Sequence, residues 1–182
     1  MRKIILYSAC SLDNFIARQD GSVDWLDDPK YFLEGEDYGY HDFYETIDTT
    51  LMGNTTYQEI LGFDVPFPYP DKTNYIFSRF KEHRDTEYVK FISSGVVDFV
   101  RQIKASEGKD IWLVGGAQIN GILLKEQLID KIYLTLIPIT LGKGIPLFDG
   151  LEHEFQFNTQ SCKMYPNGYI KLILEPDYSN FC

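Results

Sequence analysis

The feature that most constrains the fold is the segment Ile111–Ile119, which reads Ile-Trp-Leu-Val-Gly-Gly-Ala-Gln-Ile. An apolar run rich in β-branched and aromatic residues ends at Gly115 and Gly116, and a helical pattern follows at once. This pattern predicts a buried strand that enters a helix through a turn without Cβ atoms. Such a turn lets backbone N–H groups approach a ligand, and a helix N-terminus favours negative charge. The segment is a candidate phosphate site, with an ordinary turn as the alternative.

A second junction of the same kind lies earlier in the chain. The short strand Thr49–Met52 is followed by Gly53, and Thr55 or Thr56 can cap a helix that runs to about Leu61. In a parallel sheet such junctions lie at the carboxyl ends of strands, where these folds bind ligands. Two converging helix N-termini could hold a pyrophosphate, although two ordinary turns would look the same. Neither a GxGxxG fingerprint nor a GxxxxGK[ST] loop is present, which excludes the Rossmann and P-loop classes.

The rest of the chain alternates predicted strands with predicted helices and then ends in strands. The further strands are Lys3–Ala9, Asn74–Ser78, Tyr88–Ile92 and Ile132–Ile139, and the further helices are Tyr38–Ile47, Val96–Ala105 and Gln118–Glu126. Phe155–Met164 and Tyr169–Leu174 form a hairpin around Pro166-Asn167-Gly168, and the proline-rich Phe63–Asp71 is a loop. We expect one α/β domain over residues 1–182, with a mixed, mostly parallel sheet between helices and an antiparallel C-terminal hairpin.

Composition excludes several classes of protein. The formal net charge is −10, so the basic footprint of a nucleic-acid-binding protein is missing. Three cysteines and three histidines are scattered, which predicts no metal site and no disulfide framework. No apolar run is long enough to cross a membrane, and the first apolar run breaks at Ser11 without a cleavage-like site. We therefore expect a cytoplasmic protein without a nucleic-acid or membrane partner.

Five segments in a fixed order carry a resemblance to a known family. They are 11–17 with 21–26 (SLDNFIA and GSVDWL), 51–57 (LMGNTTY), 75–79 (YIFSR), 112–117 (WLVGGA), and 130–135 (DKIYLT) running on to 141–148 (LGKGIPLF). In this order the chain resembles the dihydrofolate reductase superfamily. Within it, the chain is similar to the reductase domain of the bacterial riboflavin-biosynthesis deaminase-reductase and its stand-alone relatives. The deaminase half would need a Pro-Cys-x-x-Cys zinc segment, which this chain lacks.

The resemblance implies a dihydrofolate-reductase-like three-layer sandwich, a homodimer and NADPH as cofactor. Gly115, Gly116 and Ala117 would lie under the pyrophosphate, between Val114 and the helix start at Gln118 and Ile119, with a cis peptide between the two glycines. Gly53, Asn54, Thr55 and Thr56 would hold the other side of the pyrophosphate. Ser78 and Arg79 would lie near the adenosine ribose and its 2′-phosphate. Ala9, Ile16 and Ala17 would line the nicotinamide pocket.

The resemblance also implies a substrate site, and here the chain departs from the family. Thr135 matches a threonine that hydrogen-bonds the substrate ring. Asp24 is the candidate proton donor, with a solvated loop aspartate as the alternative, because no carboxyl group falls on the family position. Trp25 would stack on the substrate or anchor its loop. Asn54 stands where the family has an arginine, and asparagine cannot pair bidentately with phosphate.

Two functions are therefore expected. The first is an NADPH-dependent reductase of a pterin-like, pyrimidine-like (5-amino-6-(5-phosphoribosylamino)uracil-type) or related small molecule. The second is a protein that binds NADPH or a small molecule without turnover, a reading motivated by Asn54 and by the missing acid. In the first case the nicotinamide carries the chemistry and the protein supplies orientation and electrostatics.

Overall fold

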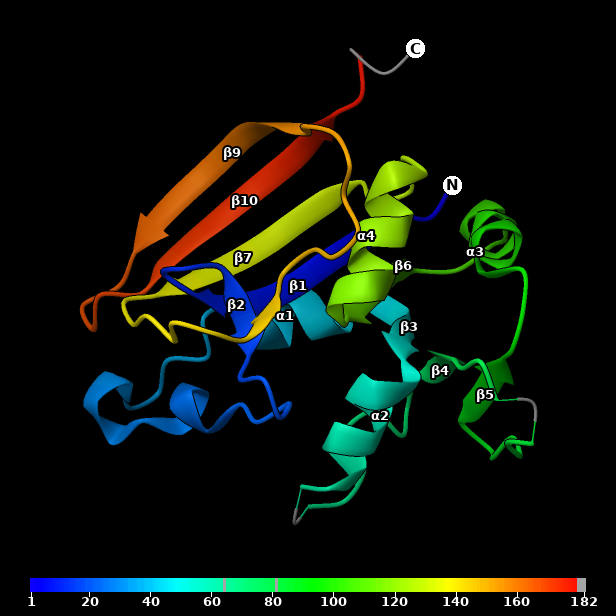
Figure 1. Ribbon diagram of the computed structural model, residues 1–182, viewed down its shortest axis with the longest axis horizontal. Coiled ribbons are helices and arrows are strands. Elements are labelled where there is room, and N and C mark those ends of the chain that lie inside the picture. Colours follow the sequence, from blue (N-terminus) through cyan, green and yellow to red (C-terminus); the bar gives the residue numbers. More distant parts are fainter. Residues whose placement is uncertain (64, 81, 180–182) are drawn as a thin grey trace.

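The computed structural model of the protein describes residues 1–63, 65–80 and 82–179, and its central element is an eight-stranded sheet (Figure 1). The sheet order is β5-β4-β3-β6-β1-β7-β10-β9. Its strands are β1 (Ile4–Ser11), β3 (Ile47–Gly53), β4 (Thr73–Phe77), β5 (Val89–Ile92), β6 (Asp110–Gly115), β7 (Lys131–Ile137), β9 (Gln156–Met164) and β10 (Ile170–Asp177). The helices are α1 (Tyr40–Glu45), α2 (Asn54–Leu61), α3 (Val96–Ala105) and α4 (Ala117–Lys125).

The strand directions confirm the predicted mixed sheet. The six strands from β5 to β7 pair in parallel, whereas β10 runs antiparallel to β7 and β9 antiparallel to β10. Figure 1 shows β9 as the outer strand of the hairpin, at the edge opposite β5. Parallel neighbours need crossover connections, and the helices α2, α3 and α4 lie in these connections.

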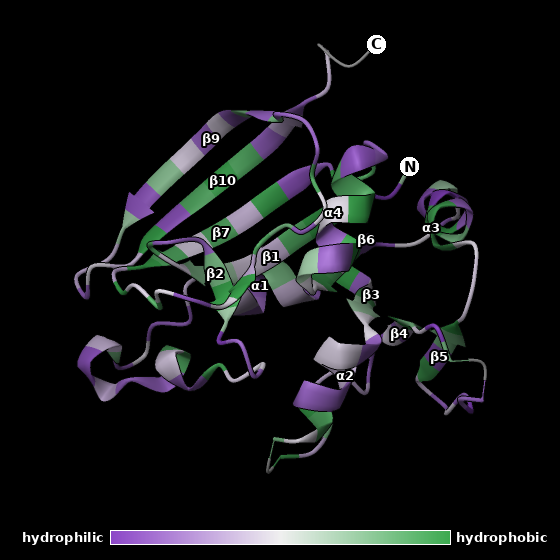
Figure 2. Ribbon diagram, in the orientation of Figure 1, coloured by the Kyte–Doolittle hydropathy of each residue, from purple (hydrophilic) through white to green (hydrophobic). Residues whose placement is uncertain are grey.

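Apolar side chains on both faces of the sheet account for three layers. On one face Leu6 and Leu113 are fully buried with Leu123 of α4. On the other face Trp112, which is 5% exposed and belongs to the core, packs with Phe43 of α1. Figure 2 shows hydrophobic residues along β1, whose two faces are both covered. A central parallel strand of this kind reads as a continuous apolar run because each face is buried.

The structure corrects several predicted boundaries. The helix predicted over 38–47 is shorter, because Ile47 begins β3 and is fully buried in the sheet. The polar stretch after β1 contains the short strand β2 (Phe15–Ala17), which pairs with β8 (Ile145–Pro146), and two 3-10 turns at Asp24–Asp27 and Pro29–Tyr31. Elements of two to four residues are too short to show a hydrophobic period, so the sequence pattern did not reveal them.

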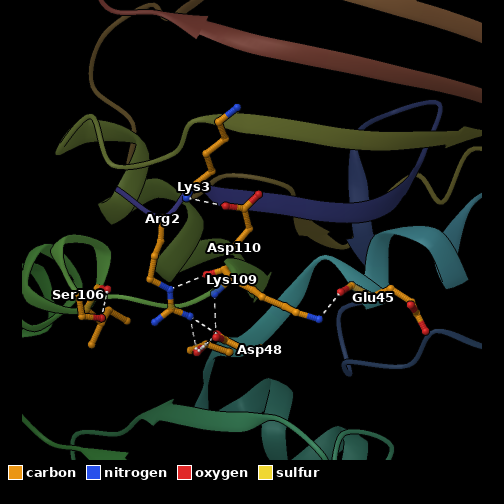
Figure 3. Close-up of polar contacts among 9 residues, drawn as sticks. Arg2, Lys3, Glu45, Asp48, Ser106, Lys109 and Asp110 are labelled. Atoms are coloured by element: carbon orange, nitrogen blue, oxygen red, sulfur yellow. Dashed lines mark hydrogen bonds and ion pairs between the residues drawn. The ribbon is translucent and has the colours of Figure 1, made fainter.

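A dense polar cluster joins the amino ends of β1, β3 and β6 (Figure 3). Arg2 is buried and donates from Nε to the Lys109 carbonyl at 2.6 Å and from a terminal nitrogen to Thr49 Oγ1 at 2.6 Å. The same guanidinium pairs with Asp48, whose second oxygen accepts the Lys109 N–H at 2.8 Å. A Cβ added at Gly108 would lie 2.8 Å from Asp48 Oδ2, so only glycine fits there. This end of the sheet is closed by paired charges.

Candidate functional site: a cavity at the carboxyl ends of the strands

A cavity of about 930 Å³ lies at the other end of the sheet, where β1, β3, β4, β5 and β6 finish. Its wall includes a residue at or within two positions of the carboxyl end of each strand, as Ala9, Gly53, Ser78, Ser93 and Gly116 show. The volume is at the upper end of the range of about 300–1,000 Å³ that small-molecule pockets span. Ligands of open α/β sheets bind at this edge, so the cavity is the candidate site.

The two strand-to-helix junctions meet inside this cavity. Met52 and Gly115 are register partners on β3 and β6. A Cβ added at Gly116 would lie 3.1 Å from Thr56 Oγ1, and one at Gly53 would lie 3.6 Å from Ile119 Cγ1. The Gly115–Gly116 peptide bond is cis, as the family resemblance implied. The missing Cβ atoms therefore leave a cradle between α2 and α4.

Both helices begin at this cradle with open N-termini. Gly53 and Gly116 are the N-cap residues of α2 and α4, and neither helix has a side-chain cap. The N–H groups of the first turn of an α-helix have no partner within the helix, and they carry partial positive charge. The first-turn residues Thr55, Thr56 and Gln118 line the cavity. The arrangement can bind an anion through backbone groups alone.

Asn120 of α4 is buried behind the cradle. It was not identified from the sequence. It is 1% exposed, its backbone N–H donates to the Gly116 carbonyl at 3.0 Å, and its Nδ2 donates to the Leu147 carbonyl at 2.8 Å. A Cβ at Gly115 would lie 3.1 Å from Asn120 Oδ1. A polar residue on the apolar face of a helix, one turn after the glycines, was the available signal. Asn120 thus packs directly against the glycine turn, and any side chain at Gly115 would collide with it.

One end of the cavity is apolar. Ala9, Ile16 and Ala17 line it together with Ile145 and Pro146 of β8. The pairing of β2 with β8 brings these residues together. A flat ring without charge suits such a wall, because apolar contact area is removed from water on both sides.

The opposite end is polar and follows β4. Ser78 is 7% exposed, lines the cavity and accepts the Phe80 N–H at 3.2 Å through Oγ. Arg79 donates to Gln118 Oε1 at 3.0 Å and has no ion pair with another described residue. Phe80 is 72% exposed and lines the cavity mouth. A guanidinium without an ion pair among the described residues can bind a phosphate group, and the exposed aromatic ring beside it can stack on the base of a nucleotide.

The structure brings nearly all predicted cofactor residues into one wall. Of these, only Gly115 is not part of the lining, and it contributes the cis peptide behind Gly116. The lining residues are Ala9, Ile16, Ala17, Gly53, Asn54, Thr55, Thr56, Ser78, Arg79, Val114, Gly116, Ala117, Gln118 and Ile119. Residues from five separate stretches of the sequence thus converge on one surface.

The three predicted substrate and catalytic residues lie outside this lining. Asp24 is exposed and paired with Arg18 at 2.6 Å, and it accepts the Ser22 hydroxyl at 2.9 Å. These two hydrogen bonds, that from Arg18 first, hold the pKa of Asp24 below its ordinary value, so its carboxyl group is ionised at neutral pH. An ionised carboxylate has no proton to donate, and this placement does not support Asp24 as the acid.

Trp25 and Thr135 are both buried. Trp25 is 2% exposed and packs with Tyr31, Tyr165 and Ile137, so it anchors its loop. Its Nε1 is buried without a hydrogen-bond partner among the described residues. Thr135 is 7% exposed and is the register partner of Ala9, whose side chain lines the cavity. Thr135 is thus one strand away from the apolar end.

Two carboxylates in the cavity wall were not predicted. Glu59 is one turn after Thr55 and Thr56 on α2, and Asp149 follows β8. A Cβ added at Gly21 would lie 2.8 Å from Glu59 Oε1, so the Gly21 loop rests on this carboxylate. The contact joins residues 38 positions apart, and no local pattern signals it.

The described residues contain no cluster of three or more His, Cys, Asp or Glu side chains that could hold a metal ion. Among these same residues, no helix combines the length and hydrophobicity that a membrane crossing requires.

Known proteins share both the sequence pattern and the fold. The family model of the RibD C-terminal domain matches residues 70–171. The uncharacterized protein YwjB of Bacillus subtilis (strain 168) is 42% identical over 165 residues, which cover 90% of this chain and 92% of YwjB. The chain belongs to the RibD C-terminal domain family.

Two solved structures extend this comparison. A protein from Shewanella sp. PV-4, provisionally assigned to riboflavin biosynthesis, superposes with a TM-score of 0.83 at 30% identity and covers 97% of this chain and 99% of that one. Dihydrofolate reductase from Enterococcus faecalis, solved in complex with NADP(H) and RAB-propyl, superposes with a TM-score of 0.64 at 15% identity and covers 96% of each chain. The second likeness shows that the fold is dihydrofolate-reductase-like.

Proposed function

We propose that the protein is an NADPH-dependent reductase of a small, flat heterocycle of the pterin or aminopyrimidine class. The observation that carries this proposal is the convergence of two open helix N-termini on one glycine cradle in the cavity. Membership of the RibD C-terminal domain family and the fold shared with an NADP(H)-binding reductase support it. Bound there, the cofactor would supply hydride, and the protein would supply position and electrostatics.

The residues present fit a dinucleotide along the whole cavity. The first-turn N–H groups of α2 and α4 would hold the pyrophosphate, where a Cβ at Gly116 would block the approach. Ala9, Ala17 and Ile145 would hold the nicotinamide ring at the apolar end. Ser78 and Arg79 would hold the ribose with its 2′-phosphate at the polar end.

Asn54 is the main departure from the family pattern at the cofactor site. Its Oδ1 is buried without a hydrogen-bond partner among the described residues, and the residue lines the cavity. Asparagine carries no charge, so it would contribute at most an amide hydrogen bond to a phosphate. Arg79, which has no ion pair with any residue that the structure describes, would take over the charge.

The substrate would lie in the part of the cavity lined by Ala9 together with Val23, Leu26 and Ile60. These apolar groups would exclude water from the face of the nicotinamide. Trp25 would keep its loop in place from the core side. Because Asp24 is exposed and ionised, we assign it to loop stability through Arg18. Thr135 would act on the substrate only through the β1 strand beside it.

A protein that binds NADPH without turnover is the second candidate. The placement of Asp24 outside the cavity favours it, because no aspartate from the 20–28 segment reaches the lining. The cradle and the cofactor-binding residues are the same in both cases. The two candidates therefore differ only in what happens to bound NADPH.

Equilibrium titration with NADPH, followed by tryptophan fluorescence, tests the binding that both candidates share. Saturation at micromolar to submillimolar NADPH is expected, and no binding at millimolar cofactor would overturn both. Absorbance at 340 nm in the presence of dihydropterins, aminopyrimidines and ribosylaminouracils then separates them. Oxidation with any of these supports the reductase, whereas tight binding without oxidation supports the second candidate.

We also propose that the protein forms a homodimer. Strand β9 pairs only with β10 among the described strands, so its outer edge is open. Open strand edges invite pairing with another chain unless they are protected. Sedimentation at micromolar concentration should give about twice the 21.1 kDa chain mass, and a monomer would contradict the proposal.

A further inference from the structure

A fixed histidine stands behind the polar end of the cavity. His83 Nε2 is 2.8 Å from Ser78 Oγ, and the His83 ring stacks on Phe91 with centroids 4.3 Å apart and planes 9° apart. Phe91 belongs to β5 and Ser78 follows β4, and these two strands pair. The imidazole is therefore held by a ring contact on one strand and a hydrogen bond at the end of the next.

The hydrogen bonds of Ser78 determine what its hydroxyl group can offer a ligand. A serine hydroxyl has one proton and two acceptor lone pairs. One lone pair accepts the Phe80 N–H at 3.2 Å. If His83 also donates to Oγ, both lone pairs are used, and the hydroxyl proton is left to donate into the cavity that Ser78 lines. If Ser78 donates to His83 instead, its second lone pair faces the ligand.

An anionic ligand selects between these two states. A phosphate oxygen accepts hydrogen bonds from a hydroxyl proton and is repelled by a lone pair. The donating state needs the proton on His83 Nε2, and that state also adds an N–H dipole directed toward the phosphate. Arg79, the next residue, supplies positive charge on the same wall and has no ion pair within the described part of the chain.

We propose that His83 is a positioning residue that directs the Ser78 hydroxyl proton into the cavity and thereby selects a ribose that carries a 2′-phosphate. The proposal rests on the proposed function, because it assumes that the polar end of the cavity holds the adenosine ribose. It explains how the chain can prefer NADPH although Asn54 replaces the family arginine. His83 acts through Ser78 and does not touch the cofactor.

Two substitutions separate the hydrogen bond from the packing of the ring. His83→Phe keeps an aromatic ring to stack on Phe91 and removes Nε2. His83→Gln places an amide N–H where Nε2 stands and loses the ring. The hydrogen-bond account predicts that the Phe variant loses 2′-phosphate selection and that the Gln variant keeps it. A purely structural role of His83 predicts the reverse order.

Calorimetric titration with adenosine 2′,5′-bisphosphate and adenosine 5′-monophosphate tests this, because the two ligands differ only in the 2′-phosphate. The wild-type protein is expected to prefer the bisphosphate. His83→Phe should lower that preference about tenfold with the monophosphate affinity unchanged, His83→Gln should retain it, and Ser78→Ala should lose it as His83→Phe does.

Each other outcome overturns the inference. These are an unchanged preference in His83→Phe, equal losses for the two ligands, a loss in His83→Gln as large as in His83→Phe, or a wild-type protein without preference. Failure of the proposed function gives a different result, because the wild-type protein would then bind neither these nucleotides nor NADPH.

Discussion

The two ends of the sheet use polar groups in opposite ways. At the amino ends, Arg2, Asp48 and Lys109 satisfy one another in a closed cluster. At the carboxyl ends, the first turns of two helices and the Arg79 guanidinium face a cavity of about 930 Å³. Charges paired with one another stabilise the fold. First-turn N–H groups without a side-chain cap, and a guanidinium without an ion pair among the described residues, can instead bind a ligand. The same strands therefore carry a structural end and a binding end.

The comparison predicts its largest effect at the amino ends. Arg2→Met removes a guanidinium whose side chain is 7% exposed, and with it the ion pair to Asp48 and the hydrogen bond to the Lys109 carbonyl. Because Asp48 is 42% exposed, water replaces part of the interaction, and we expect a loss of about 2–3 kcal/mol in the free energy of unfolding. Urea denaturation measures this loss. The NADPH affinity of the folded variant should stay unchanged.

Arg101→Met is the matched control for that substitution. Arg101 forms ion pairs with Glu126 and Asp98 at the surface, where its side chain is 52% exposed. Exposed pairs contribute about 0–1 kcal/mol, so this variant should unfold close to the wild-type midpoint. If Arg2→Met weakened NADPH binding as much as it lowered stability, the two ends would not be separable.

A substitution at the binding end should have the opposite profile. Gly116→Ala places a Cβ 3.1 Å from Thr56 Oγ1, inside the cradle. We expect NADPH affinity to fall about tenfold to thirtyfold, which corresponds to about 1.4–2 kcal/mol, with a smaller change in stability. Fluorescence titration and urea denaturation measure the two quantities on the same protein.

Gly62→Ala is the control for the Gly116 substitution. Its new Cβ would lie 3.2 Å from the backbone carbonyl oxygen of Glu59, a contact of similar length, and Gly62 itself is not part of the cavity lining. This variant should lose stability without losing NADPH affinity. Equal effects of both substitutions on binding would argue that the cradle is not the phosphate site.

The smallest effect is expected at Asp24, which lies near the binding end but outside the cavity. The Arg18 hydrogen bond lowers the pKa of Asp24, so the carboxyl group loses its proton at a lower pH than an ordinary aspartate does. If Asp24 were the proton donor, the rate would rise only as the pH falls toward this lowered pKa. Asp24→Asn and the wild-type protein should therefore show the same pH profile of NADPH oxidation between pH 5 and 9. A tenfold loss of turnover in Asp24→Asn would restore Asp24 as a candidate acid.

The residues predicted to bind a cofactor lie together in the cavity wall because the sequence signals that mark them are local. Each glycine turn follows an apolar run and precedes a helix, so Gly53 and Gly116 mark strand ends without knowledge of the fold. Once the sheet is mostly parallel, such ends must meet at one edge. The same logic explains why Ser78 at the end of β4 lies beside them.

The missed residues act through contacts between distant parts of the chain. Asn120 matters because its side chain reaches the Leu147 carbonyl, and His83 matters because β5 places Phe91 under its ring. The Arg18 side chain decides the state of Asp24, although the sequence shows only two charged loop residues. Strands as short as β2 and β8 show no hydrophobic periodicity, so their pairing, and with it the apolar end of the cavity, could not be predicted from the sequence.

A crystal structure of the wild-type protein with NADPH tests the central claim most directly. The account predicts one cofactor per chain at the carboxyl ends of the strands. Its pyrophosphate should lie between Gly116 and Thr56, its nicotinamide against Ala9 and Ala17, and its 2′-phosphate near Ser78. NADPH bound at any other surface, or crystals without bound NADPH at saturating concentration, would contradict it.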